Sequence, residues 1–125
     1  MPVEPGLSAE VELTVTDQDT AAAMHAGDVD VLSTPRIIAL CEEASMLAIG
    51  GKLDHNETAV GHSVQLDHVA PTKVGGRVRA EATLQKVAGR RLTFTVSVTD
   101  ARGLVAAGKI TRVIVDRDRF MERAH

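Results

Sequence analysis

Three side chains of different chemistry are spaced so that one site could use them together. Thr34 precedes an apolar stretch, Glu42 follows eight residues later, and His68 lies a further 26 residues along the chain. A hydroxyl, a carboxylate and an imidazole are groups that serve in nucleophilic attack and in general acid–base catalysis. These residues are therefore the first candidates for a catalytic site, provided that the fold brings them together.

The apolar stretch after Thr34 predicts one long helix. Ser33 or Thr34 suits the N-cap, Pro35 suits the first helical position, and Gly50-Gly51 ends the helix. Residues at helical spacing form a wide apolar stripe: Ile37, Ile38, Leu40, Cys41, Ala44, Ser45, Leu47, Ala48 and Ile49. So wide a stripe indicates a helix that is wrapped by a sheet.

Glu42 falls at the border of this stripe, whereas Glu43 falls on the polar side of the helix. A half-buried carboxylate beside Ile38 and Ile49 would have its pKa raised by desolvation, which suits a base or a poorly hydrated nucleophile. Thr34 has a competing structural role as the helix cap, which Ser33 could take instead. A glycine inside a strand, such as Gly61, marks either a close approach by another group or a bulge.

Alternating apolar residues predict a sheet around the helix. The expected strands are 9–16, 59–69, 77–87, 91–99 and 104–115, with a short helix at 18–26 and a short edge strand at 29–32. The strand 59–69 would place Val60, His62, Val64, Leu66 and His68 on one face.

The economical arrangement is an antiparallel sheet curled around one long apolar helix, an α+β fold of the hotdog type. We expect one domain over residues 1–125, with a loose leader at 1–7 and a charged surface tail at 116–125. Such a sheet has an exposed edge with which a second chain can pair. A homodimer, or a higher oligomer built from it, is therefore expected.

Composition excludes several classes of function. The net charge of −3, two Phe and no Trp or Tyr argue against nucleic-acid binding. No signal peptide and no membrane-spanning run is predicted, so a cytoplasmic location and no membrane partner are expected. The single Cys41 allows no internal disulfide and is predicted to pack inertly in the core. No metal-ligand spacing occurs, so neither a metal nor another cofactor is expected.

The joint spacing of these residues resembles the fluoroacetyl-CoA thioesterase-like family of hotdog proteins. That family has a threonine at the helix start, a glutamate eight residues later and a histidine 26 residues beyond, as Thr34, Glu42 and His68 do here. Its glycine seven residues before the histidine corresponds to Gly61, and an arginine on the last strand corresponds to Arg112. The similarity covers roughly residues 8–115.

The resemblance implies hydrolysis of an acyl-CoA thioester. Glu42 would attack the thioester carbonyl or activate water, and Thr34 would position Glu42 and help to hold the carbonyl region. His68 would be the acid–base partner. Gly61 would supply backbone shape and an N–H close to the acyl group, and Arg112 would lie near the pocket. Hotdog active sites generally lie at a dimer interface, with the pantetheine arm of the substrate between subunits.

Differences from the family bear on the substrate, and two other functions compete with thioester hydrolysis. The family's founding member has aromatic residues around its pocket, whereas Met24 to Leu32 contains none, so a short or medium acyl group other than fluoroacetyl is expected. A hotdog hydratase or dehydratase would carry a D-x4-H motif, and no histidine here has an aspartate five residues before it. A non-catalytic acyl-CoA-binding or ligand-sensing protein stays open on sequence alone.

Overall fold

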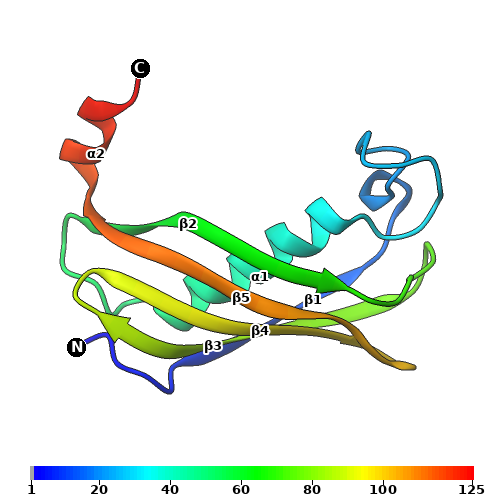
Figure 1. Cartoon of the computed structure of the whole chain (residues 1–125), viewed down its shortest axis with the longest axis horizontal. Helices are drawn as coiled ribbons and strands as arrows, with labels where there is room; N and C mark the ends of the chain where they lie inside the picture. Colours follow the sequence, from blue (N-terminus) through cyan, green and yellow to red (C-terminus); the bar gives the residue numbers. More distant parts are fainter. Residues whose placement is uncertain (1) are drawn as a thin grey trace.

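In the computed structural model, which describes residues 2–125, five antiparallel strands form one sheet that curls around a long helix (Figure 1). The elements are β1 (Ser8–Thr14), the 3-10 turn η1 (Asp17–Asp19), α1 (Thr34–Ala48), β2 (Glu57–His68), β3 (Arg77–Ala88), β4 (Arg91–Asp100), β5 (Gly103–Asp116) and α2 (Arg117–Arg123). The strands lie in the order β1-β3-β4-β5-β2. The predicted α+β hotdog arrangement is confirmed.

The long helix α1 starts one residue earlier than a threonine cap would place it. Ser33 is the N-cap, and its hydroxyl accepts a hydrogen bond from the backbone N–H of Arg36 at 3.2 Å. Thr34 is therefore the first helical residue, and Pro35 the second, where its missing N–H costs no helical hydrogen bond. This choice of cap matters for the site, because it frees the hydroxyl of Thr34.

The apolar stripe of α1 is narrower than predicted. The residues of α1 that are buried are Ile37, Leu40, Cys41, Ala44, Ser45 and Ala48. Ile38 is only half-buried and Leu47 is 56% exposed, because α1 packs mainly on β1 and β3 and touches β2 much less. One side of α1 is consequently open toward β2.

A β-bulge in β2 decides which of its side chains face α1. Gly61 pairs with Arg112 of β5, but the next pair joins Ser63 to Thr111, so His62 is an extra residue on its strand. The extra residue reverses the alternation of faces. Gly61 and His68 therefore point to the same side of the sheet, although His68 is seven positions after Gly61, an odd offset that would put them on opposite sides of a regular strand.

The bulge corrects the expected face of β2. Val64, Leu66 and His68 share a face as predicted, whereas Val60 and His62 do not lie on it. Val60 alternates with Gly61, and the Nδ1 atom of His62 lies 3.2 Å from the hydroxyl of Thr111. His62 is thus separated from the side of the sheet that faces α1.

Several smaller elements also differ from expectation. The segment 18–26 contains only the end of η1 and then turns, and 29–32 makes isolated bridges, one of them between Val31 and Lys73, instead of a strand. The charged tail forms α2, which is capped by Asp116. Val3 and Leu7 pack against the core, so the leader is not loose. No helix within residues 2–125 has the length and apolar character needed to cross a membrane.

Candidate functional site

Thr34 and His68 touch each other directly, although they lie 34 positions apart in the chain. The Oγ1 atom of Thr34, at the start of α1, is 2.8 Å from Nδ1 of His68, at the end of β2. Because Ser33 caps the helix, the hydroxyl of Thr34 is available for the imidazole. When Thr34 donates this hydrogen bond, the other ring nitrogen, Nε2, carries the proton.

The Nε2 atom of His68 is buried and has no hydrogen-bond partner within residues 2–125. Buried polar atoms in native proteins are nearly always satisfied, and an unsatisfied one costs about 1–3 kcal/mol. A hollow of about 240 Å³ adjoins the ring, lined also by Val31, Val69, Ala70 and Pro71. The imidazole thus has one ring nitrogen in contact with Thr34 and one without a partner in residues 2–125.

Glu42 lies against a buried arginine. Its Oε1 atom is 3.4 Å from Nη1 of Arg112, whose Nη2 donates to the carbonyl oxygen of Ala59 at 2.9 Å. The side chain of Glu42 is 38% exposed and that of Arg112 only 10%. Burial lowers the pKa of Arg112, and the negative charge of Glu42 opposes that shift. The carboxylate of Glu42 therefore contacts a cation. The helical wheel had predicted only apolar neighbours for it.

Gly61 makes room for this carboxylate. It is the cross-strand partner of Arg112, and a Cβ atom at position 61 would lie 2.8 Å from Oε1 of Glu42. Any larger residue would displace the glutamate from the strand. Both interpretations of this glycine thus apply, because a bulge follows it and another group closely approaches it.

Within one chain, the five candidate residues form two groups of contacts. Thr34 contacts His68, and Glu42 contacts Arg112 and lies against Gly61. Eight residues of helix between Thr34 and Glu42 correspond to a rise of about 12 Å. Because of the bulge, both groups lie on the side of β2 that faces α1. Together they line a strip between α1 and β2, without a direct hydrogen bond between the groups in residues 2–125.

Cys41 is not a competing nucleophile. It is fully buried on the core side of α1, and burial together with the charge of Glu42 raises the pKa of its thiol to about 11. The thiol is therefore neutral near physiological pH, and neutral thiols are poor nucleophiles. The predicted inert role of Cys41 agrees with this environment.

Sequence reasoning missed Asp19, which secures the loop before α1. Its carboxylate is 3.0 Å from Nε of Arg36 and accepts hydrogen bonds from the backbone N–H and hydroxyl of Thr16. Burial acts to raise the pKa of Asp19, but the hydrogen bonds from Thr16 and the contact with Arg36 outweigh it, so the pKa lies below 3.8. The signal in the sequence was the capping-box spacing of Thr16 and Asp19.

Comparison with known proteins gives a family match over most of the chain. The sequence model described as fluoroacetyl-CoA-specific thioesterase matches residues 15–118. A fluoroacetyl-CoA thioesterase from Streptantibioticus cattleyicolor is 30% identical over 91 residues, which are 73% of this chain and 66% of that protein. The match therefore spans just under two thirds of that relative's length.

Solved structures show the same fold. A mutant of the fluoroacetyl-CoA thioesterase FlK in complex with fluoroacetate and CoA is 25% identical, with a TM-score of 0.88 over 94% of this chain and 99% of that one. A hypothetical protein of Thermus thermophilus, described as a thioesterase superfamily member, is 28% identical, with a TM-score of 0.89 over 97% of this chain and 90% of that one.

Proposed function

The chain belongs to the fluoroacetyl-CoA-specific thioesterase family, and on this basis we propose that it hydrolyses an acyl-CoA thioester with a short or medium acyl group. Thr34, Glu42 and His68 are the catalytic residues in this proposal. The observation that carries it is the 2.8 Å contact between Thr34 and His68, which orients the imidazole and leaves its buried Nε2 atom without a partner. A protein that only bound acyl-CoA would not need an imidazole with one nitrogen fixed by a hydroxyl and the other without a partner.

Glu42 is the nucleophile or the general base of this proposal. The carboxylate either attacks the carbonyl carbon of the thioester or removes a proton from the water that does so. Arg112 holds Oε1, and no hydrogen bond within residues 2–125 engages Oε2, so lone pairs of Oε2 are available for either role. Gly61 allows the carboxylate to lie against β2 and places a backbone N–H beside the acyl group.

His68 supplies a proton to the departing sulfur. When a new C–O bond forms at the carbonyl carbon, the C–S bond breaks and the thiolate of CoA leaves. The Nε2–H of His68 can protonate this thiolate when Thr34 donates its hydroxyl proton to Nδ1, which is the arrangement that this proposal requires. In the nucleophilic route, water then cleaves the acyl–Glu42 anhydride, which releases the carboxylic acid and restores the free carboxylate of Glu42. In the base route, the attacking water becomes part of the carboxylic acid directly, and Glu42 gives its proton to solvent. In both routes His68 regains a proton from solvent.

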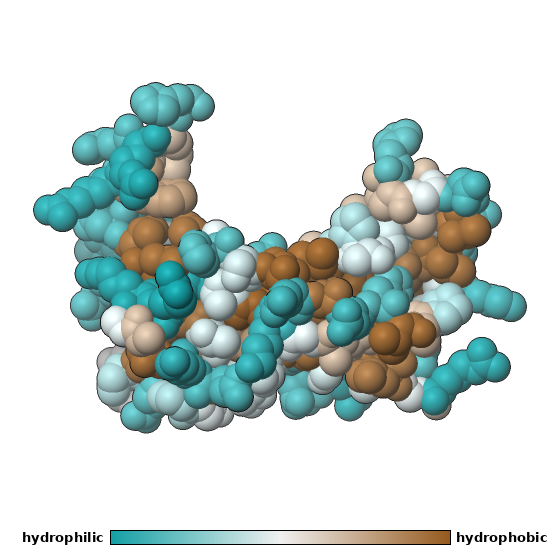
Figure 2. Space-filling view, viewed as in Figure 1, coloured by the Kyte–Doolittle hydropathy of each residue, from teal (hydrophilic) through white to brown (hydrophobic). Residues whose placement is uncertain are grey.

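A second copy of the chain completes the site in this proposal. β2 is a terminal strand of the sheet, its residues 61–65 are exposed, and it contains no proline. Val64 is 39% exposed although it faces the α1 side. Figure 2 shows that the surface beside β2 is hollowed between α2 and the loop preceding α1. Pairing of two β2 edges would fill this hollow and cover the open strip that holds both contact groups.

The proposed substrate class follows from the composition of the loop that precedes α1. The loop from Met24 to Leu32 contains no aromatic side chain. Met24 and Val29 are its exposed large apolar residues, and Ser33 donates a hydrogen bond to the sulfur of Met24 at 2.9 Å. A flexible thioether can pack against acyl groups of different shape. We therefore assign short or medium acyl chains, without a preference for the fluorinated acid.

Release of free thiol from a panel of acyl-CoA substrates tests this function. The panel contains acetyl-, fluoroacetyl-, butyryl- and hexanoyl-CoA, and steady-state turnover of at least one unfluorinated member is expected. Tight binding without turnover would contradict the proposal and support the acyl-CoA sensor instead. Sedimentation velocity tests the second copy: a dimer is expected at assay concentration, and a fully active monomer would contradict the shared site.

A further inference from the structure

A cavity of about 770 Å³ opens at the end of the sheet, where the β4–β5 hairpin meets the loop that follows β2. Three cations, Lys73, Arg77 and Arg102, line it together with two carboxylates, Glu12 and Asp100. The lining of this cavity therefore carries a net positive charge, whereas the whole chain has a net charge of −3. It lies outside the contacts that involve Thr34, Glu42 and His68.

The two carboxylates of the cavity leave Lys73 and Arg102 without an ion-pair partner in the described part of the chain, whereas Arg77 is paired with Glu12 at 3.6 Å. Both oxygens of Asp100 are engaged, one by the hydroxyl of Thr72 at 3.1 Å and the other by the backbone N–H of Arg102 at 2.8 Å. Asp100 thereby fixes the hairpin that carries Arg102. Glu12 forms exposed ion pairs with Arg77 and Arg79. The side chains of Lys73 and Arg102 have no carboxylate partner within 4.0 Å among residues 2–125.

This basic cavity continues toward the catalytic histidine. Val31 and Pro71 line both the cavity and the hollow beside His68. The bridge between Val31 and Lys73 ties the loop before α1 to the loop after β2 at this point. Lys73 lies five positions after His68, a span of at most about 18 Å. A ligand that reached both would need a reactive group and an anionic group joined by a long arm.

We propose that this cavity binds the phosphate-bearing nucleotide of the acyl-CoA substrate. Lys73 and Arg102 contact the phosphates, and the apolar walls at Val31, Pro71 and Ala101 contact the base or ribose. The arm between sulfur and pyrophosphate then runs over Val31 and Pro71 to His68. This assignment rests on the proposed function for the identity of the substrate, and it deepens that proposal by naming residues that select CoA over smaller thioesters.

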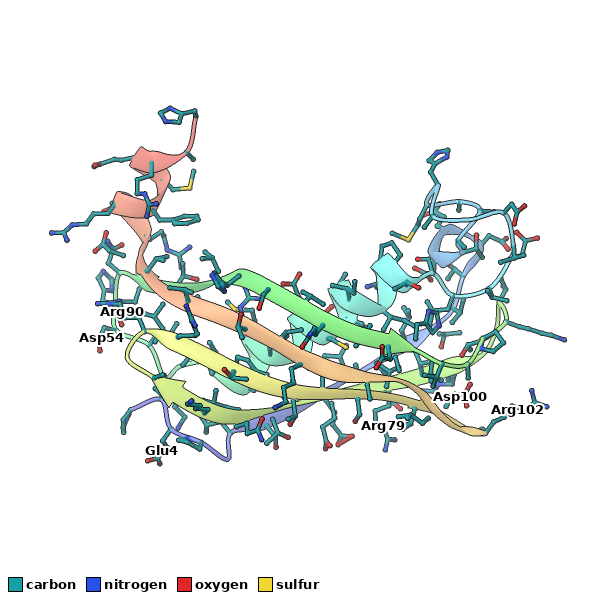
Figure 3. The ribbon with its side chains drawn as sticks, in the orientation of Figure 1. Glu4, Asp54, Arg79, Arg90, Asp100 and Arg102 are labelled. Atoms are coloured by element: carbon teal, nitrogen blue, oxygen red, sulfur yellow. The ribbon has the colours of Figure 1, made fainter. Side chains whose placement is uncertain are left out.

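A second basic cluster provides a matched control. Arg90, Arg119 and Arg123 line a hollow of about 230 Å³ together with Phe120 and Asp116. Arg90 already pairs with Glu57 at 3.1 Å. Figure 3 shows Arg90 at one end of the sheet and Arg102 at the other. No residue lines both this hollow and the one beside His68.

The experiment compares three proteins: wild type, Lys73→Ala/Arg102→Ala and Arg119→Ala/Arg123→Ala. Calorimetry measures the Kd for CoA, and kinetics measures KM and kcat with acetyl-CoA and with acetyl-N-acetylcysteamine, a thioester without phosphates. Removal of two exposed charge contacts should raise the Kd and the KM for the CoA compounds roughly tenfold. The expected kcat is unchanged, and so is activity on the phosphate-free thioester. The control variant should behave as wild type.

The outcomes separate the two proposals. Unchanged CoA affinity in the Lys73→Ala/Arg102→Ala variant, or a loss in the control variant instead, overturns the cavity assignment whatever the turnover. Equal losses on the phosphate-free thioester also overturn it, because they indicate a general structural defect. If wild type binds CoA through Lys73 and Arg102 but hydrolyses no thioester, the cavity assignment stands and the thioesterase proposal fails.

Discussion

The Glu42 carboxylate occupies the space where a side chain on Gly61 would lie, with only 2.8 Å between its Oε1 atom and an ideal Cβ at position 61. Real Cβ atoms do not approach an oxygen so closely, so the glycine and the position of the carboxylate depend on each other. Gly61 also pairs with Arg112, which contacts the same oxygen. A methyl group at position 61 therefore tests whether activity depends on the position of the Glu42 carboxylate.

Gly61→Ala should lower activity far more than stability. The methyl group pushes the flexible end of Glu42 away, and a displacement of about 1 Å in a catalytic group can cost roughly a hundredfold in rate. The glutamate is partly exposed and can move without opening the core, so Tm should change little. Measurements of kcat and Tm check this, with Ser63→Ala on the same strand as the control. Full activity of Gly61→Ala would show that the position of Glu42 is unimportant.

Neighbouring residues at the start of α1 should separate stability from catalysis. Ser33→Ala removes the helix cap and should cost about 1 kcal/mol in the free energy of unfolding, with kcat largely retained. Thr34→Val removes only the hydroxyl that bonds His68, so kcat should fall at least about tenfold while stability changes little. Thr34→Ser should restore most of the rate. The prediction fails if Thr34→Val keeps wild-type kcat, or if both variants affect only stability.

His68→Ala should flatten the limb of the pH–rate profile near neutral pH. Imidazole is the side chain that titrates in this range, and a general acid on the leaving thiolate makes the rate depend on its protonation. His62→Ala is the matched control, because His62 contacts Thr111 away from the α1 side. The profile of kcat/KM between pH 5 and 9 checks both. An unchanged limb in His68→Ala, or its loss in His62→Ala, would remove His68 from the acid–base role.

The contribution of Asp19 to stability should disappear in acid. Its pKa in the folded protein is lowered below 3.8 by Thr16 and Arg36, against the opposing effect of burial. A depressed pKa means that the stabilisation is complete above the unfolded-state value, near pH 4, and is lost as pH falls through the folded-state value. Urea unfolding of wild type and Asp19→Asn should therefore differ at pH 6 and converge toward pH 2. A gap that persists at pH 2 would contradict the assigned cause.

The sequence predicted the ends of α1 and the place of Glu42 at the border of its apolar stripe, because both depend on residues close together in the chain. The N-cap and the stop at Gly50-Gly51 follow from capping preferences, and the position of Glu42 follows from helical periodicity. The width of the stripe was wrong at Leu47, because width depends on how far the sheet extends around the helix. That extent is a tertiary property and has no local signal.

The face of β2 could be predicted only in part. Strict alternation grouped His62 with His68, and the extra residue at the bulge breaks that grouping. Gly61 signalled an irregularity, but not where the extra residue would lie. The contact between Glu42 and Arg112, which are 70 positions apart, depends on the pairing of β2 with β5 and could not come from spacing within either element. The helix α2 was missed because its short charged sequence lacks an apolar stripe.

Glu42→Gln tests the central claim most directly. The amide keeps the shape of the side chain but loses its basicity and its nucleophilicity, so release of CoA thiol should fall by at least about a hundredfold. Tm should stay close to that of wild type, and calorimetry should still show binding of CoA. The account predicts this loss on every acyl-CoA that wild type hydrolyses. Turnover above about a tenth of the wild-type rate would contradict it, because loss of a central catalytic group costs orders of magnitude.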